Sequence, residues 1–190
     1  FNAAGVAQAD FENLIITNTS SKALTVTGGA GNDTMVGSAD ATAGDTLTGG
    51  AGVDTFTMAG NLDYTDNIDG GDGKDVMTVS GATVGDVAFM NTTNVETLTV
   101  DRSGTSTVTL SSYFTTAGVA TVNLDPTHVS TISAAGTTSG VNYVAKGARA
   151  EAITAGTGDD TFTFGQVGTM TNADVINGGA GTDTIAIDNS

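Results

Sequence analysis

Apolar residues recur along this chain with a fixed period of 21 residues. Polar residues, mostly threonine, stand on both sides of many of them, as in Thr25-Val26-Thr27. This alternation, written in β-branched side chains, is typical of a strand with one buried face. Two interleaved series share the period, and their members are Leu14, Met35, Phe56, Met77 and Leu98 in one series, and Val26, Leu47, Ile68, Phe89 and Leu110 in the other.

A period of this length predicts a solenoid, in which each repeat forms one coil. We expect each coil to hold two short strands, joined by a six-residue turn on one edge and by a longer turn on the other. Stacking of the coils then places the strands in two parallel sheets, back to back. The predicted fold class is therefore all-β, a right-handed parallel β-solenoid of about nine coils with its termini at opposite ends.

The pattern divides the chain into two regular blocks. Residues 1–110 form the first block, residues 111–131 with the single proline Pro126 form an irregular coil or insertion, and residues 132–190 form the second block. We expect one continuous solenoid, and because the chain begins at Phe1 we expect it to be a piece of a larger protein. The apolar series resumes in the second block at Ile132, Val141, Ile153, Phe162, Ile176 and Ile185.

The chain is strongly acidic, which narrows the choice of partners. Its 190 residues include 21 acidic and only 5 basic side chains, for a formal net charge of −16. We therefore expect no nucleic-acid partner and no binding to anionic membranes, whereas cations are favoured. The sequence has no cysteine and no apolar run long enough to span a membrane, so we expect neither a disulfide framework nor direct membrane insertion.

The six-residue turn is rich in glycine and always closes on an aspartate. Glycine adopts positive φ angles without steric penalty, so such a turn can reverse direction and aim its carbonyl groups inward. When these turns stack, carbonyl oxygens and the aspartates of successive coils converge, and they form an all-oxygen cage suited to Ca²⁺. Five copies occur, and they begin at Gly28, Gly49, Gly70, Ala155 and Gly178.

The motif GGxGxDxUx in these turns resembles the calcium-binding repeat of RTX proteins, and this resemblance implies the fold of an RTX-like β-roll. The resemblance also implies Ca²⁺ as the cofactor, with carbonyl groups of the turns completing each ion's shell. The carboxylate ligands that it implies are Asp33, Asp54, Asp75, Asp160 and Asp183. The metal-site glycines that it implies are Gly29, Gly31, Gly50, Gly52, Gly71, Gly73, Gly156, Gly158, Gly179 and Gly181.

The second edge of the coil departs from the family pattern. RTX rolls carry the motif on both edges, whereas here the second edge is a longer loop without the glycines. Acids on this edge, nine residues before an aspartate of the motif, are expected as further ligands, and they are Asp45, Asp66, Asp174 and Glu151. The turns near residues 91–96 and 134–140 lack the motif, so we expect those coils to stack without calcium there.

The inventory of side chains argues against an enzyme. The single histidine, His128, lies in an expected loop, and no nucleophile set, phosphate-binding loop or dinucleotide fingerprint occurs. The phrases DFENLIIT at Asp10 and NVETLTVD at Asn94, beside the calcium motif, resemble the lattice-forming regions of RTX-type bacterial surface-layer proteins. That resemblance implies a structural protein that leaves the cell by type I secretion and folds on calcium. It also implies self-association into a lattice at the cell surface, with anchoring to polysaccharide through another domain.

Two other functions remain open. In one, the chain is the calcium-folded stalk or secretion module of a larger adhesin, toxin or extracellular hydrolase. In the other, the solenoid binds ice or glycan through its rows of threonine. A full-length sequence with a catalytic or adhesive domain would favour the first, and thermal hysteresis or glycan binding would favour the second.

Overall fold

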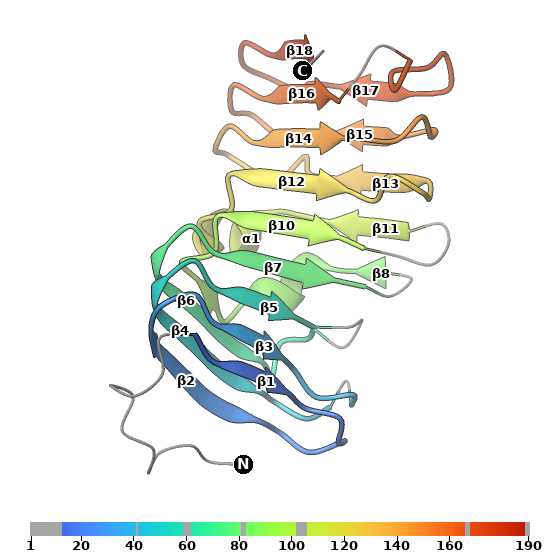
Figure 1. The fold of residues 1–190 in the computed structure, drawn as a ribbon. Coiled ribbons are helices and arrows are strands. Elements are labelled where there is room, and N and C mark those ends of the chain that lie inside the picture. The colour runs from blue at the N-terminus through green and yellow to red at the C-terminus, as the bar shows by residue number, and fades with distance from the viewer. Residues whose placement is uncertain are drawn as a thin grey trace.

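The computed structural model describes residues 13–40, 42–58, 62–80, 83–101, 106–165 and 168–188. In these ranges the chain winds as a parallel β-solenoid of about eight turns, with about 21 residues in each turn (Figure 1). The first and the last of the described coils lie at opposite ends of the rod. The predicted fold class, an all-β parallel solenoid, is confirmed.

One sheet runs the whole length of the rod and contains nine parallel strands. The second residue of each of three neighbouring strands is directed inward, so Met35, Phe56 and Met77 stack directly on one another in the core. In spatial order the strands are β1 (Ile15–Thr17), β3 (Thr34–Val36), β5 (Thr55–Thr57), β7 (Val76–Val79), β10 (Thr97–Val100), β12 (Thr121–Leu124), β14 (Asn142–Ala145), β16 (Thr161–Phe164) and β18 (Thr184–Ile187).

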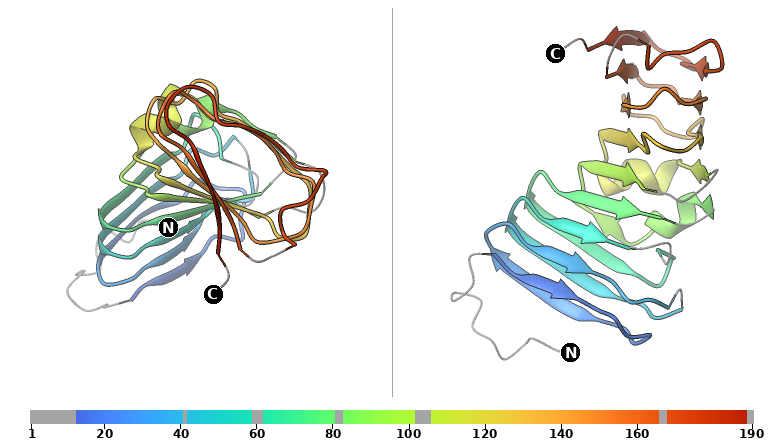
Figure 2. Two further views of the ribbon diagram at one scale, coloured as in Figure 1. Left: turned by 90° about the horizontal axis from the view of Figure 1, so that it is seen from above. Right: turned by 45° about the vertical axis from the view of Figure 1, so that its right-hand side comes forward.

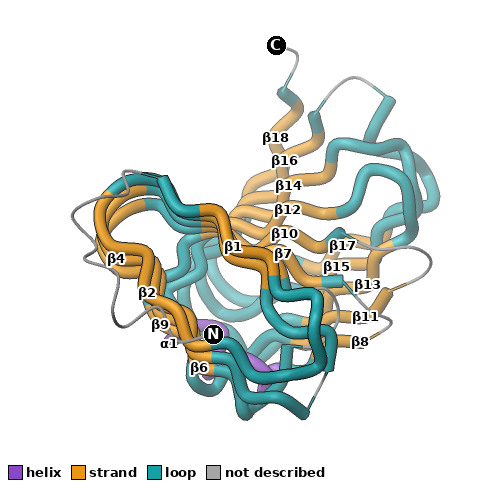
Figure 3. Tube along the Cα trace, turned by 60° about the horizontal axis from the view of Figure 1, so that its bottom comes forward, coloured by secondary structure: helices purple, strands orange, loops and turns teal. Residues whose placement is uncertain are grey.

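The other wall of the rod consists of two shorter parallel sheets. The four-stranded sheet contains β2 (Thr25–Ala30), β4 (Thr46–Gly52), β6 (Asn67–Gly73) and β9 (Thr92–Thr93). The five-stranded sheet contains β8 (Thr83–Val84), β11 (Ser106–Thr109), β13 (Ser130–Ser133), β15 (Ala152–Thr154) and β17 (Val175–Asn177). In Figure 3 the two shorter sheets lie apart, with the nine-stranded sheet continuous between them. The N-terminal and C-terminal coils therefore overlap only in part when the rod is viewed end-on (Figure 2).

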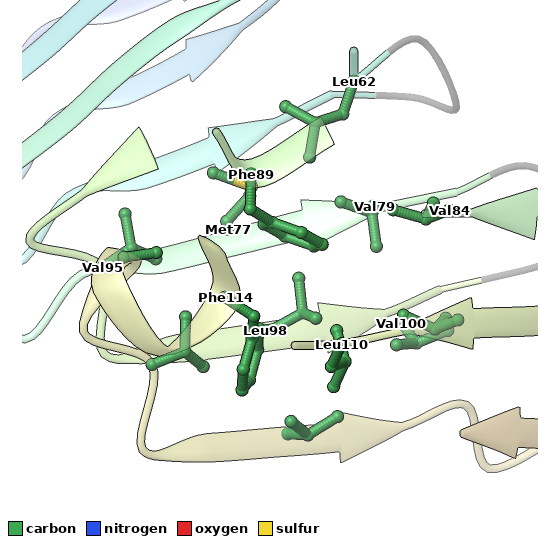
Figure 4. Close-up of a cluster of buried hydrophobic side chains, with 14 of the residues drawn as sticks. Leu62, Met77, Val79, Val84, Phe89, Val95, Leu98, Val100, Leu110 and Phe114 are labelled. Atoms are coloured by element: carbon green, nitrogen blue, oxygen red, sulfur yellow. The ribbon is translucent and has the colours of Figure 1, made fainter. Parts of the chain in front are cut away.

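The change from one sheet to the other coincides with two short helical segments, η2 (Asp86–Phe89) and α1 (Ser112–Ala117). Each contributes a buried phenylalanine, and the rings of Phe89 and Phe114 meet edge to face with centroids 5.8 Å apart (Figure 4). Such edge-to-face pairs are favourable beyond the area that they bury. The two segments thus fill the core where the second wall changes its position.

A carboxylate joins the two helical segments. Asp86 in η2 accepts backbone N–H groups of Ser111 and Phe114, at 2.6 and 3.1 Å, at the start of α1. Helix N-termini have unpaired N–H groups, so this acid caps α1 from the preceding coil.

The coils here are 24 residues long, as the pairing of Thr97 with Thr121 shows.

The register of the strands corrects several predicted inward positions. Ile16, and not Leu14, pairs with Met35, because the first described coil is 19 residues long. Tyr143, and not Val141, pairs with Phe162 for the same reason. Leu14 and Val141 are therefore out of register with the inward series, although Val141 is buried in the core and Leu14 packs against it.

The second series also breaks after Ile68. Thr92 pairs with Ile68 in the four-stranded sheet, whereas Phe89 lies in η2. Leu110 follows the last residue of β11, a strand of the five-stranded sheet. Both predicted members, Phe89 and Leu110, are buried but stack outside the series, because the helical insertions lengthen these coils.

Candidate metal centre

The glycine-aspartate turns of the N-terminal coils connect the four-stranded sheet to the nine-stranded sheet. β4 extends through the glycines of its turn as far as Gly52. The turn then closes on Asp54, immediately before β5. The glycines of successive turns are paired in register, Gly29 with Gly50 and Gly50 with Gly71. Every backbone atom of one turn therefore has its counterpart directly above it in the next turn.

Only glycine fits into this stack. A Cβ atom at Gly50 or Gly52 would collide with the carbonyl oxygen of Gly29 or Gly31, respectively, in the coil below. The φ angles of Gly50 and Gly52 are +114° and +133°, in the region that favours glycine. The same positive φ holds at Gly29, Gly31, Gly71, Gly73, Gly179 and Gly181.

The turn that begins with Ala155 differs from the others. Gly156 and Gly158 lack the positive φ angles of the other turns, so the expected backbone conformation is wrong for these two glycines. A Cβ atom at Gly156 would still collide with the carbonyl oxygen of Thr137 in the coil below. This turn therefore keeps the close stacking of its neighbours with a different backbone path.

The five aspartates of the motif form two hydrogen-bonded ladders. Asp33, Asp54 and Asp75 each use Oδ1 to accept the backbone N–H at the equivalent position one coil below, always at 2.7 Å. In the second ladder, Asp160 accepts from Val141 at 2.8 Å and Asp183 accepts from the N–H of Asp160 at 3.0 Å. Leu14 and Val141 occupy the aspartate position at the bottom of each ladder, which explains why they are out of register with the inward series.

The second carboxylate oxygen of these aspartates is the unusual feature. Oδ2 is buried and has no hydrogen-bond partner in each of Asp33, Asp54, Asp75 and Asp160. A buried polar atom without a partner is strongly destabilising, and buried charges normally pair or bind metal ions. Something other than the protein's own donors must therefore satisfy these oxygens.

In the four motifs that begin with glycine, the first glycine packs against Oδ2 of the aspartate. A Cβ atom at Gly28 would collide with Oδ2 of Asp33 and would also meet the carbonyl oxygen of Gly49 from the next coil. Gly49 lies in the same way against Asp54 and the carbonyl of Gly70. Oδ2 of Asp33 and the carbonyl oxygen of Gly49 thus both lie close to Gly28, and a cation bound beside them would satisfy Oδ2. The sequence interpretation did not include Gly28, Gly49, Gly70 and Gly178 among the site residues, although the doubled glycine marked them.

The pKa values of three motif aspartates are raised, as expected for buried carboxylates. Burial raises the pKa of Asp54, the N–H of Asp33 partly offsets that rise, and the negative charge of Asp33 adds to it. Burial also raises the pKa of Asp75 and of Asp160. Within the described ranges, no three His, Cys, Asp or Glu side chains group as metal ligands. An ion here must take much of its shell from backbone carbonyl groups, as Ca²⁺ readily does.

A scan against protein families matches this chain. The family model for the RTX calcium-binding nonapeptide repeat, in four copies, matches residues 25–43 and 170–186. Together with the stacked turns and the parallel solenoid, this match supports an RTX-type β-roll. The matched repeats are of the calcium-binding kind. No curated protein and no solved structure shows a significant match to it.

The acids on the second edge of the β-roll are engaged differently. Asp45 accepts backbone N–H groups with both oxygens, from Leu24 and Ser38, each at 2.6 Å. Both oxygens of Asp66 and of Asp174 are likewise occupied by backbone N–H groups. These three acids therefore have none of the unpartnered oxygens of the glycine-aspartate edge, and their use as calcium ligands stays a prediction.

Glu151 is the exception on this edge. It is buried and neither carboxylate oxygen has a hydrogen-bond partner. Burial, together with the neighbouring carboxylate of Asp174, raises the pKa of Glu151 to about 8. The side chain is therefore expected to carry a proton at neutral pH, so its predicted role as a calcium ligand competes with protonation.

Replacement of Asp54 tests whether adjacent coils share their ions. In Asp54→Asn the side-chain amide oxygen can still accept the N–H of Asp33. The negative charge of Asp54, which the ions on both sides of its turn would share, is lost. We expect the ions on both sides of Asp54 to bind at least about tenfold more weakly, because affinity follows ligand charge. Isothermal titration with calcium measures this effect. Asp72→Asn, an exposed acid in the next turn, is the matched control, and equal binding by both variants would contradict shared ligation.

Replacement of Glu151 has a pH-dependent effect on stability. The pKa of Glu151 is higher in the folded chain than its ordinary value of 4.5. The folded state therefore binds the proton more tightly, and the stabilisation is complete below about pH 4.5 and is lost as the pH rises through about 8. We expect Glu151→Gln to match the wild type below about pH 4.5 and to unfold at progressively higher urea than the wild type as the pH rises from about 4.5 to about 8. Urea unfolding in saturating calcium measures this difference. A variant that is less stable at every pH and binds fewer ions would instead identify Glu151 as a ligand.

Proposed function

We propose that this β-roll is the structural calcium-binding module of a secreted bacterial surface-layer protein. It stays unfolded in the cytosol, folds on meeting extracellular calcium and then assembles into a lattice at the cell surface. The observation that carries the proposal is the set of buried Oδ2 atoms of Asp33, Asp54, Asp75 and Asp160, which have no donor. A folded state that contains these oxygens is favoured only when a cation accompanies them.

The affinity expected of such sites supports folding that depends on the difference in calcium concentration between the cytosol and the outside of the cell. Extracellular calcium modules typically bind with dissociation constants of about 10⁻⁴ to 10⁻³ M, far weaker than the sites of cytosolic buffers. At cytosolic calcium the acidic chain, with a net charge of −16, would lack the ions that fold it. RTX repeat proteins are typically secreted and extracellular. No helix in the described part of the chain is long and apolar enough to cross a membrane.

Support for the lattice comes from sequence phrases and from shape. The phrase NVETLTVD contributes β10 and the acid that precedes it, so the surface-layer-like segment is an integral coil of the rod. The rod has its two ends far apart and a nine-stranded sheet along its full length (Figure 1), which gives it long exposed faces for contacts between molecules.

The two alternatives predict different behaviour. A stalk or secretion module would fold on calcium without assembling. Binding of ice or glycan would need an unbroken flat row of threonines. Thr34, Thr55 and Thr97 lie in one row on the nine-stranded sheet, but Val76 breaks this row between Thr55 and Thr97. The surface-layer module therefore remains the better-supported function.

A calcium titration of this chain tests the proposal. We expect far-ultraviolet circular dichroism to show strand content only when calcium reaches about 10⁻⁴ to 10⁻³ M, with magnesium as the control ion. Sedimentation velocity on the same samples should then show large assemblies. Full strand content in chelator would refute the folding switch, and calcium-dependent folding without assembly would favour the stalk.

A further inference from the structure

The N-terminal ladder of carboxylates does not end at the last glycine-aspartate turn. Glu96, which precedes β10, uses Oε2 to accept the backbone N–H of Asp75 at 2.8 Å. This is the same hydrogen bond that Asp75 makes to the N–H of Asp54 one coil below. Glu96 thus occupies the ladder position although its turn lacks the motif. No carboxylate continues the ladder above it, where the N–H of Ala120 bonds to the carbonyl of Glu96.

The short turn before β10 also keeps a carbonyl of the motif. Because Asp69 pairs with Thr93, Asn94 lies directly above Gly70. A Cβ atom at Gly70 would meet both Oδ2 of Asp75, at 2.5 Å, and the carbonyl oxygen of Asn94. Gly28 and Gly49 meet the corresponding pair of oxygens in the turns below. Asp75 and Asn94 therefore place beside Gly70 the same two acceptor oxygens that complete motifs place beside Gly28 and Gly49.

Glutamate compensates for the missing part of the turn. Asn94 to Glu96 spans three residues where Gly70 to Asp75 spans six. The additional methylene of glutamate lets its carboxylate reach the N–H of Asp75 from this shorter turn. Asn94 has a φ of +53°, a left-handed conformation that asparagine tolerates better than most residues. Its side chain donates to Oδ1 of Asp69 at 2.8 Å, which holds the turn in place.

Negative charge is concentrated around this space. Asp75 is completely buried and its Oδ2 has no hydrogen-bond partner. Burial raises the pKa of Asp75, and the charges of Asp54, Glu96 and Asp69 add to the rise. A buried carboxylate that faces a carbonyl and a second carboxylate is stabilised by a hard cation.

We propose that Glu96 and the carbonyl of Asn94 complete a further divalent-cation site above Asp75, so the N-terminal row of ions extends one coil beyond the last glycine-aspartate turn. This inference rests on calcium binding by the regular turns. It assigns a ligand role to a turn that lacks the motif, where the sequence predicted stacking without calcium.

Glu96→Gln tests this site directly. The amide oxygen of glutamine can still accept the N–H of Asp75, so the coil should stack normally while the site loses one charge. We expect native mass spectrometry and calorimetric titration to show one calcium ion fewer than the wild type, or one site weakened at least about tenfold. Asp101→Asn, an exposed acid at the other end of the same strand, should bind as the wild type does. Unchanged stoichiometry and affinity in a folded Glu96→Gln chain would overturn the proposal, whereas absence of calcium binding by the wild type would overturn the proposed function.

A measurement on the wild-type chain covers the case in which the variant does not fold. The sequence contains only three glutamates, Glu12, Glu96 and Glu151. Labelling the side-chain carboxyl carbon of glutamate with ¹³C therefore gives a simple NMR spectrum. Exchange of calcium for cadmium in the folded chain should move the ¹³C signal of Glu96, because the chemical shift of a coordinating carboxylate depends on the metal that it binds. A Glu96 signal that does not move while the rod stays folded would overturn the proposal.

Discussion

The fold depends on the repulsion between acceptor oxygens that the stacked turns bring together. The coils that carry Asp33, Asp54 and Asp75 each place a buried carboxylate oxygen close to a carbonyl oxygen of the next coil, as Asp33 and Gly49 show at Gly28. Stacking at the strand spacing makes these contacts unavoidable, because the glycines that allow the coils to approach also expose their carbonyl groups. A bound cation reverses the sign of this interaction, so the same contacts that oppose stacking without calcium hold the coils together with it.

The aspartate has two tasks in this arrangement. Its Oδ1 accepts an N–H of the coil below, so it fixes the register between coils, and its Oδ2 remains for the ion. On the second edge both oxygens of Asp45 go to backbone N–H groups, so an acid there fixes the register alone. The two edges therefore differ in chemistry although both present stacked acids, and the difference lies in the glycine-aspartate motif, which the second-edge loops lack.

Much of the fold could be predicted from the sequence because the repeat is regular between Val26 and Ile68, where each coil has 21 residues. The exceptions have physical causes. Leu14 fits the period of the inward residues, yet it occupies the aspartate position of a shorter coil, and spacing alone cannot separate these two assignments. The segments around Phe89 and Phe114 are too short for a helical period, so neither the helical turns nor the change of sheet could be anticipated. The motif located the turns, but the role of Glu96 depends on a register that only the structure gives.

Calcium acts in this account as a structural element that the N-terminal and C-terminal ladders both require. In this role, cations lie between Oδ2 of one turn and the carbonyl of the next. The most direct test is diffraction from crystals grown in calcium, at a wavelength where calcium scatters anomalously. The account predicts anomalous peaks beside Oδ2 of Asp33, Asp54 and Asp160. Ordered turns with no cation there, and with Oδ2 bonded to water or protonated, would contradict it.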